Sequence, residues 1–170
     1  LLQKGCRRVY AVDVGYGQLA WTLRQDPRVI SLERQNIRYL SPDDLPERAD
    51  LATIDVSFIS LSLVLPAVKE LVVRAGDILC LVKPQFEVGK GEVGKGGVVR
   101  DPQKHEQVLR KVIACANDLG LWTLGLIRSP LKGPKGNVEF FLHLRSDSQR
   151  SSDYPIPGQA GDGRAPSIQT

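Results

Sequence analysis

The sequence predicts an α/β protein with a mostly parallel sheet that ends in an antiparallel pair. Short apolar segments alternate with helical patterns over most of the 170 residues, and this alternation is typical of parallel sheets covered by helices. Near the C-terminus, two strand-like segments at 121–127 and 138–144 follow each other with only a loop between them. Such a connection indicates an antiparallel end of the sheet.

The N-terminal region is expected to hold two strands separated by a helix. Residues 1–5 read like the last turn of a helix that ends at a glycine, as if the chain began inside an element. Residues 8–14 are rich in β-branched side chains and place Asp13 at the carboxyl end of a strand. A glycine turn then leads to a helix at 18–25, and residues 28–32 form the next strand.

The middle of the chain predicts two more strands, each of which ends at a charged residue. Residues 51–55 deliver Asp55, and an apolar helix at 61–73 follows, closed by Gly76. The apolar run at 78–86 reads as a buried parallel strand that leads into Lys83 and then a proline. Ligands of open α/β sheets bind outside the carboxyl ends of the strands, so Lys83 stands where chemistry is expected. The alternative is a lysine that only marks where the strand reaches solvent.

The C-terminal half continues with a glycine-rich loop, a helix, two strands and a tail. Residues 88–99 contain five glycines and two lysines. Asp101 and Pro102 form a typical helix start, and the helix runs to Leu119. Residues 146–170 carry almost no large apolar side chain, so we expect a disordered tail after a domain at 1–145.

Composition and charge exclude several classes of protein. The formal net charge is +4, and many basic residues lie in loops and at helix ends, which favours an anionic partner over a scattered solvated surface. The three cysteines have no metal-ligand or CxxC spacing, so we expect reduced thiols, no metal site and a cytoplasmic protein. No apolar run approaches the ~20 residues of a membrane-spanning helix.

Two glycine motifs resemble nucleotide-binding sequences. Residues 89–95 match GxxxxGK, but Gly96 stands where a Mg²⁺-binding Ser or Thr belongs, and no helix starts there. Asp13, Gly15 and Gly17 resemble the first turn of a dinucleotide fold, with Glu33 as the acid for the ribose. Against that interpretation, too few elements would remain between Glu33 and Asp55.

Four ordered segments, at 9–21, 54–60, 81–87 and 93–102, resemble the TlyA (haemolysin A) family of ribosomal RNA 2′-O-ribose methyltransferases, within the FtsJ-like group. The likeness extends from residue 1 to about residue 144. It implies a Rossmann-like class I methyltransferase domain, S-adenosyl-L-methionine as cofactor, and ribosomal RNA or a ribosomal subunit as partner. It also implies that the first strand, the cofactor loop and a small S4-type RNA-binding domain lie upstream of this chain, and that Asp13 closes the second strand.

The resemblance implies catalytic roles for Asp55, Lys83 and Glu139, as the last three members of a Lys-Asp-Lys-Glu tetrad. Lys83 would accept or polarise the proton of a ribose hydroxyl, and the two carboxylates would orient the amine. Alternatively, Asp55 is a helix cap and Glu139 an outward-facing strand residue.

Further roles follow from the same resemblance. Asp13 would bind the ribose of the cofactor, and Asn36 its adenine edge unless it is a plain turn residue. Asp55 would also border the cofactor. We assign RNA binding to Lys90, Lys95 and Arg100, in a loop at 87–100 that we expect to be mobile without RNA.

Three functions remain open on the sequence alone: an RNA methyltransferase, a haemolysin-type cytolytic protein, and a catalytically inactive fragment that only contacts RNA. No amphipathic or spanning segment supports the cytolytic function. Because the resemblance places the cofactor loop upstream, we expect the isolated chain to bind S-adenosylmethionine weakly or not at all.

Overall fold

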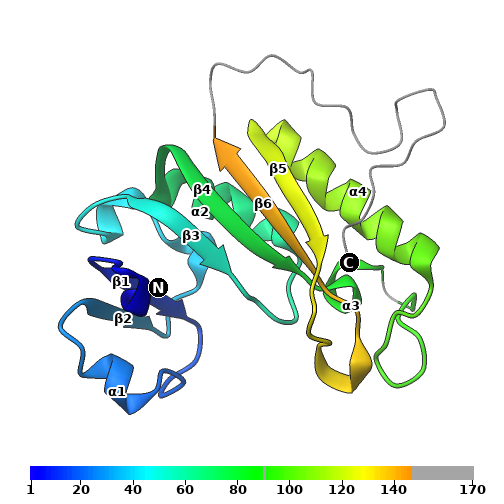
Figure 1. Ribbon diagram of the computed structural model, residues 1–170, viewed down its shortest axis with the longest axis horizontal. Coiled ribbons are helices and arrows are strands. Elements are labelled where there is room, and N and C mark those ends of the chain that lie inside the picture. Colours follow the sequence, from blue (N-terminus) through cyan, green and yellow to red (C-terminus); the bar gives the residue numbers. More distant parts are fainter. Residues whose placement is uncertain (90, 147–170) are drawn as a thin grey trace.

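The computed structural model describes residues 1–89 and 91–146, whose strands form two sheets (Figure 1). The smaller sheet pairs β1 (Val9–Asp13) with β2 (Val29–Glu33) in parallel. The larger sheet has the order β3-β4-β6-β5. Its strands are β3 (Ala49–Ile54), β4 (Val72–Val82), β6 (Phe140–Ser146) and β5 (Leu121–Arg128).

The strand directions confirm the expected α/β fold with an antiparallel end. β3 and β4 run parallel, whereas β6 is antiparallel to both β4 and β5. In the described ranges, β1 pairs only with β2 and β3 pairs only with β4. The first strand that the resemblance places between β1 and β3 therefore stays a prediction.

Helices and short 3₁₀ turns connect the strands. The α-helices are α1 (Trp21–Arg24), α2 (Leu65–Leu71), α3 (Pro84–Glu87) and α4 (Pro102–Asp118). The 3₁₀ turns are η1 (Leu2–Lys4), η2 (Ile37–Tyr39), η3 (Pro42–Asp44), η4 (Leu61–Leu63) and η5 (Pro134–Gly136). Gly5 ends η1 with a φ of 88°, as expected for a glycine that closes a helical turn.

The hydrophobic core lies between the larger sheet and the helices α2 and α4, which run behind that sheet in Figure 1. Alternate residues of β4 (Ile78, Cys80 and Val82) are buried in this core together with Val108 and Val112 of α4. The intervening residues of β4 point to the opposite face, because side chains alternate along a strand. The two faces of β4 thus serve different purposes: one builds the core and the other is open to the site.

The predicted C-terminal end of the helix at 61–73 is wrong. α2 ends at Leu71, and Val72 already pairs with Ala49 of β3. The next pair joins Leu51 to Asp77, so the residues between Val72 and Asp77 form a bulge.

Other element boundaries also differ from those predicted from the sequence. The helix expected at 18–25 is only the single turn α1, because the chain first makes a turn in which Gly17 has a φ of 72°. The 3₁₀ turns η2 and η3 had no counterpart in the sequence prediction. Ser146 is the last residue of β6, and the domain boundary after residue 145 stays a prediction. Residues 147–170, where we expect a disordered tail, lie outside the described residues.

The bulge in β4 generates a prediction about Gly76. A Cβ at this position would lie 2.9 Å from the carbonyl oxygen of Val73, 3.0 Å from that of Asp50, and closer still to the side chain of Val72. We therefore expect Gly76→Ala to lower the free energy of unfolding by about 1–3 kcal/mol. The measurement is urea unfolding of the complete protein.

The matched control is Gly125→Ala in β5, where the nearest atom to a new Cβ is that of His143 at 4.0 Å. This variant should be as stable as the wild type or slightly more stable. Equal stability of the two variants would contradict the assigned bulge.

Candidate active site

The carboxyl ends of β3 and β4 bring Asp55 and Lys83 together. Both residues directly follow their strands, and the parallel register places Ile54 opposite Cys80. Lys83 Nζ lies 2.6 Å from Asp55 Oδ1, with the lysine side chain only 12% exposed and the aspartate 68% exposed. Lys83 therefore does more than mark the point where the strand reaches solvent. Asp55 is no helix cap either, since Ser60 caps the following turn η4.

Lys83 has a second partner that the sequence did not suggest. Its Nζ donates to Ser57 Oγ at 3.3 Å. An ammonium group has three N–H donors, and in the described part of the chain Asp55 and Ser57 are the partners of this one. The remaining donor is available for an oxygen atom of a substrate.

Glu139 is buried at the same edge of the sheet and does not face outward. It is 6% exposed, and its Oε1 accepts a hydrogen bond of 3.1 Å from Gln85 Nε2. Its carboxylate packs against Gly133, where a Cβ would overlap Oε1 and lie 2.5 Å from Cδ. Because Phe140 pairs with Val82, the antiparallel register places Glu139 beside the residue that follows β4.

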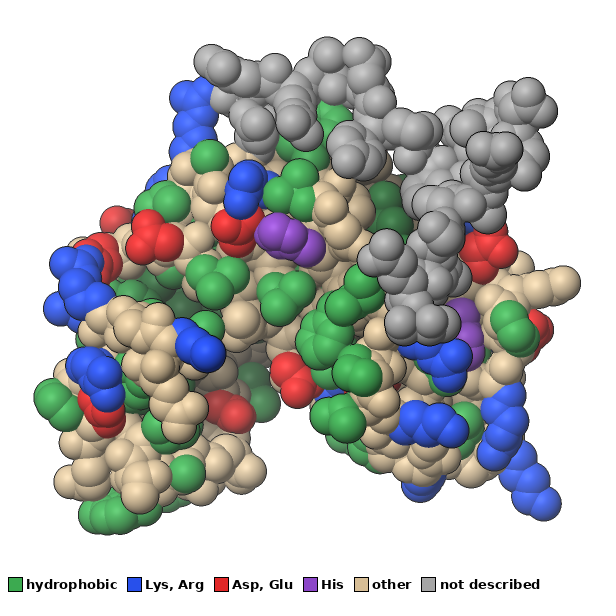
Figure 2. All heavy atoms as spheres, viewed as in Figure 1, with side chains coloured by type: hydrophobic (Ala, Val, Ile, Leu, Met, Phe, Trp, Pro, Cys, Tyr) green, Lys and Arg blue, Asp and Glu red, His purple; other side chains and the backbone are tan. Residues whose placement is uncertain are grey.

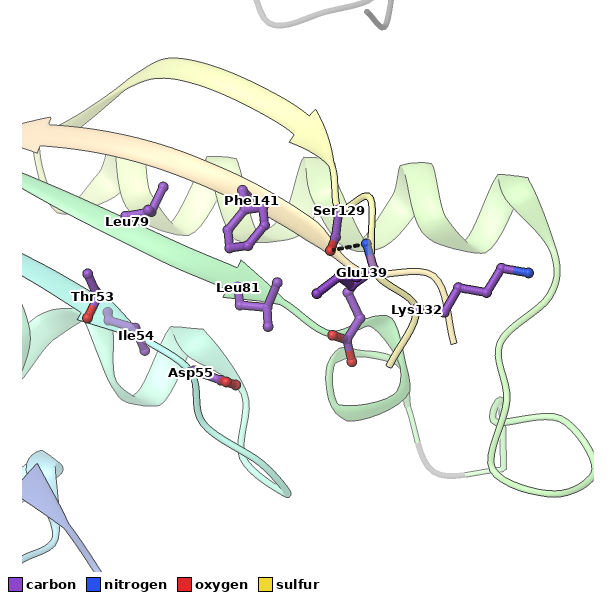
Figure 3. A pocket seen from close by; sticks show the side chains of 10 residues that line it. Thr53, Ile54, Asp55, Leu79, Leu81, Ser129, Lys132, Glu139 and Phe141 are labelled. Carbon is purple, nitrogen blue, oxygen red and sulfur yellow. Dashed lines mark hydrogen bonds between the residues drawn. The ribbon is translucent and has the colours of Figure 1, made fainter. Parts of the chain in front are cut away.

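Asp55 and Glu139 line one pocket of about 390 Å³ (Figure 3). Figure 3 shows Leu79, Leu81 and Phe141 along the strands and Ser129 and Lys132 on the loop between β5 and β6. In the described ranges, Lys83 forms its ion pair with Asp55 and none with Glu139. Glu139 is instead linked to the lysine through Gln85, which lies two residues after Lys83.

Asn137 is a buried polar residue that sequence reasoning missed. Its Nδ2 donates to the carbonyl oxygens of Gly97 (3.0 Å) and Pro134 (3.1 Å), and its Oδ1 accepts from Val99 N (3.1 Å). Val98 and Val99 are also buried. The C-terminal half of the glycine-rich loop is therefore packed on the protein, which differs from the mobile loop that we expected.

A second group of residues lies at the carboxyl ends of β1 and β2. Asp13 is exposed, and its Oδ1 accepts a hydrogen bond of 2.7 Å from Gly15 N. Glu33, the rival candidate for a ribose contact, is already bound by Gly17 N at 2.8 Å and by Arg24. The hydrogen bond from Arg24 holds the pKa of Glu33 below its ordinary value. Asp13 is thus the carboxylate that is available to a ligand.

Asn36 lies near Asp13 but is used in a turn. Gln35 N donates to the carbonyl oxygen of Asp13 at 3.0 Å, which brings the two segments together. The side chain of Asn36 caps η2, and its Oδ1 accepts from Arg38 N and Arg38 Nε, both at 3.2 Å. This geometry fits the interpretation as a turn residue and leaves the amide nitrogen for a ligand.

Basic side chains surround the same end of the larger sheet. Lys95 and Arg100 are exposed on either side of the buried valines, whereas Lys90 lies outside the described residues. Lys132 and Lys135 are exposed on the loop between β5 and β6, and Lys135 Nζ approaches Gly97. Figure 2 shows Lys and Arg side chains gathered over this region.

The sheet order, the helices and the charged residues at the strand ends define a Rossmann-like class I methyltransferase fold. The N-methyltransferase NodS from Bradyrhizobium japonicum has this fold, with a TM-score of 0.57 at 12% identity over 85% of this chain and 69% of that chain.

The chain belongs to the family of FtsJ-like methyltransferases, whose family model matches residues 1–146. It is 54% identical to the 16S/23S rRNA (cytidine-2'-O)-methyltransferase TlyA of Mycobacterium tuberculosis, over 89% of this chain and 56% of that protein. A hemolysin-named structure from Streptococcus thermophilus has a TM-score of 0.83 and 50% identity, over 86% of this chain and 54% of that chain. The resemblance drawn from the motifs is confirmed, and the chain spans little more than half the length of these relatives.

The contact between Gly133 and Glu139 generates a second prediction. Gly133 has a φ of −71°, so alanine is compatible with the backbone, and the three atoms nearest to the new methyl group all belong to the carboxylate of Glu139. From the role that the resemblance implies for Glu139, we expect Gly133→Ala to lower the turnover number of methyl transfer by about tenfold or more, since a small misplacement of such a group is costly.

The double variant Gly133→Ala/Glu139→Ala provides the control. It should be no slower than Glu139→Ala alone, because the two substitutions act on one group. If the turnover losses of the two single variants multiply in the double variant, measured by steady-state kinetics, Gly133 acts on a group other than Glu139.

Proposed function

We propose that this chain is the catalytic domain of a cytoplasmic enzyme that methylates a ribose 2′-hydroxyl of ribosomal RNA. The observation that carries the proposal is the 2.6 Å pair of Lys83 and Asp55, beside a pocket that Glu139 also lines. The name of the Mycobacterium tuberculosis relative, a 16S/23S rRNA 2'-O-methyltransferase, supports this substrate class.

The geometry supports a division of labour among the catalytic residues. Once Lys83 has given one proton to solvent, its Nζ would take up the proton that the 2′-hydroxyl loses while the hydroxyl oxygen accepts the methyl group. Asp55 Oδ1 stabilises the resulting ammonium at 2.6 Å, and Ser57 Oγ fixes its direction from 3.3 Å. Glu139 positions the turn that follows Lys83 through its hydrogen bond with Gln85.

The residues at the strand ends fit S-adenosyl-L-methionine, which supplies an activated methyl group on a sulfonium centre. Asp13 can accept from the two ribose hydroxyls of the cofactor, because a carboxylate has about four acceptor sites and, among the described residues, Gly15 N donates the one hydrogen bond to it. Asn36 is assigned to the adenine edge, through its amide nitrogen, which has no partner in the described part of the chain. Asp55, with most of its side chain exposed, is assigned to the border between cofactor and hydroxyl.

The RNA partner is assigned to the basic surface beside the pocket. Exposed Lys95 and Arg100, together with Lys132 and Lys135, offer cations to phosphate groups. Lys90 is proposed to join them. An S4-type RNA-binding domain in the remainder of the complete protein is part of the same proposal, since the chain spans 56% of the Mycobacterium tuberculosis relative.

The other two functions gain no support from a specific observation. Across residues 1–89 and 91–146, the helices lack the length and apolar character that crossing a membrane requires. A domain that only contacts RNA would have no need for a nearly buried lysine paired with an aspartate. Cofactor binding separates such a domain from the proposed enzyme.

The assigned roles predict opposite effects for Lys83 and Asp13. In the complete enzyme, Lys83→Ala should lower the turnover number at least about 100-fold, because it removes the group that handles the proton. Its dissociation constant for the cofactor should stay within about twofold. Asp13→Ala should instead raise that dissociation constant, measured by calorimetry. Lys69→Ala, a change of the same kind on α2, is the control and should leave both quantities unchanged.

Wild-type turnover in Lys83→Ala would overturn its assignment. Equal cofactor affinity of Asp13→Ala and wild type would overturn the ribose contact.

The basic surface predicts a change in the salt dependence of RNA binding. Each lost phosphate contact should reduce the slope of log K against log salt by about 0.7–0.9. We therefore expect the double variant Lys95→Ala/Arg100→Ala to show a smaller slope than the wild type in a binding titration. Arg110→Ala is the control, because this exposed arginine on α4 already pairs with Glu106. Equal slopes in the first variant and the wild type would remove the loop from the RNA interface.

A further inference from the structure

Glu87 is a buried carboxylate to which the reaction described above gives no role. It ends α3, the single turn that directly follows Lys83, and is 4% exposed. Its Oε1 accepts a hydrogen bond of 2.7 Å from Leu61 N, and its Oε2 accepts one of 2.6 Å from Ser60 Oγ. Both of its oxygens are thus bound to the start of η4.

The loop that leads into η4 is also bound near its beginning, by Lys83. The loop between β3 and η4 begins at Asp55 and ends at Ser60, and Lys83 Nζ contacts Asp55 and Ser57 near its beginning. Between these two attachments, the rings of Phe58 and Phe86 lie 4.8 Å apart between centroids. The two loops that follow β3 and β4 are therefore joined at both ends and in the middle.

Val56 and Ile59 of this loop pack against the core, but the residues between them and Asp55 before them are exposed. Phe58 is 90% exposed and has a φ of 61°, a conformation that costs energy for a residue with a Cβ. Asp55 is also mostly exposed. A strained and exposed segment persists only where its surroundings fix it, and the attachment at Glu87 is a buried one.

Glu87 is itself held from behind by the longest helix. Lys111 of α4 donates from Nζ to the carbonyl oxygen of Glu87 at 3.0 Å. α4 packs into the core through Val108 and Val112. Through Glu87 and α4, the loop at 55–60 is therefore attached to the rigid core and not to another loop.

We propose that Glu87 is a positioning residue for methyl transfer, which fixes the loop at 55–60 so that Asp55 meets Lys83. The proposal rests on the proposed function of Lys83. Glu87 acts through Ser60 and Leu61 and touches no substrate. A carboxylate suits this role because its two oxygens accept from a backbone N–H and a hydroxyl at once.

The test compares Glu87→Ala with Glu87→Gln in the complete enzyme. Glu87→Ala should lower the turnover number by about ten- to a hundredfold, with the KM for RNA and the cofactor dissociation constant within about twofold of wild type. Glu87→Gln should recover most of the turnover, because its amide accepts from Leu61 N and donates to Ser60 Oγ. Hydrogen exchange of the Leu61 amide should be faster in Glu87→Ala and close to wild type in Glu87→Gln.

Leu121→Ala separates positioning from a general loss of stability. Leu121 is buried at the start of β5, at the end of the sheet away from Glu139. This variant should lose thermal stability but keep its turnover at a temperature where it is folded. A parallel loss of turnover in Leu121→Ala and Glu87→Ala would overturn the proposal, and so would wild-type turnover in Glu87→Ala.

Failure of the proposed function would be recognised separately. Full activity in Lys83→Ala would overturn the role of Lys83 whatever the result for Glu87. Unchanged exchange at Leu61 in Glu87→Ala would overturn the attachment of the loop alone.

Discussion

The parallel pairing of β3 with β4 is the constraint on which the grouping of Lys83, Asp55 and Glu139 depends. It delivers two chain segments to one edge of the sheet, where Lys83 and Asp55 meet at 2.6 Å. β6 pairs antiparallel with β4 on the side away from β3, and this pairing brings Glu139 to the same edge of the sheet. An ion pair with one mostly exposed partner adds little to stability. The sheet therefore holds the pair together, and the pair contributes little to holding the sheet.

Local sequence signals located the strands, although β6 begins and ends two residues later than the strand expected at 138–144. Short runs of apolar and β-branched residues located β1, β3 and β5, and the charged residue after each of β3 and β4 was visible in the sequence itself. The beginning of β4 was not, because Val72 and Val73 continue the apolar pattern of α2 without a break. Only the pairing of Val72 with Ala49 and the positive φ of Ala75 reveal that the helix has ended. Both are products of tertiary structure.

The parts of the site that the sequence did not reveal depend on distant partners. Asn137 resembles an ordinary loop residue, yet its partners Val99 and Gly97 lie 38 and 40 positions away. Glycines and lysines suggested a loop free of the protein, whereas two valines and one asparagine anchor its second half. The loop that carries the basic residues is thus attached two positions from Glu139, so the proposed RNA-binding surface and the buried carboxylate share one support.

The single turn α3 concentrates more contacts than its length suggests. The expected strand at 78–86 ends at Val82, and α3 takes its last residues. Lys83 before α3 binds the loop after β3, Gln85 binds Glu139, Phe86 meets Phe58, and Glu87 reaches η4. Each added residue in a helix rotates all later side chains by about 100° and advances them by about 1.5 Å. One inserted or deleted residue would thus break several of these contacts together, whereas a substitution breaks one. The segment behaves as a spacer of fixed length, which tolerates changes of residue type more readily than changes in the number of residues.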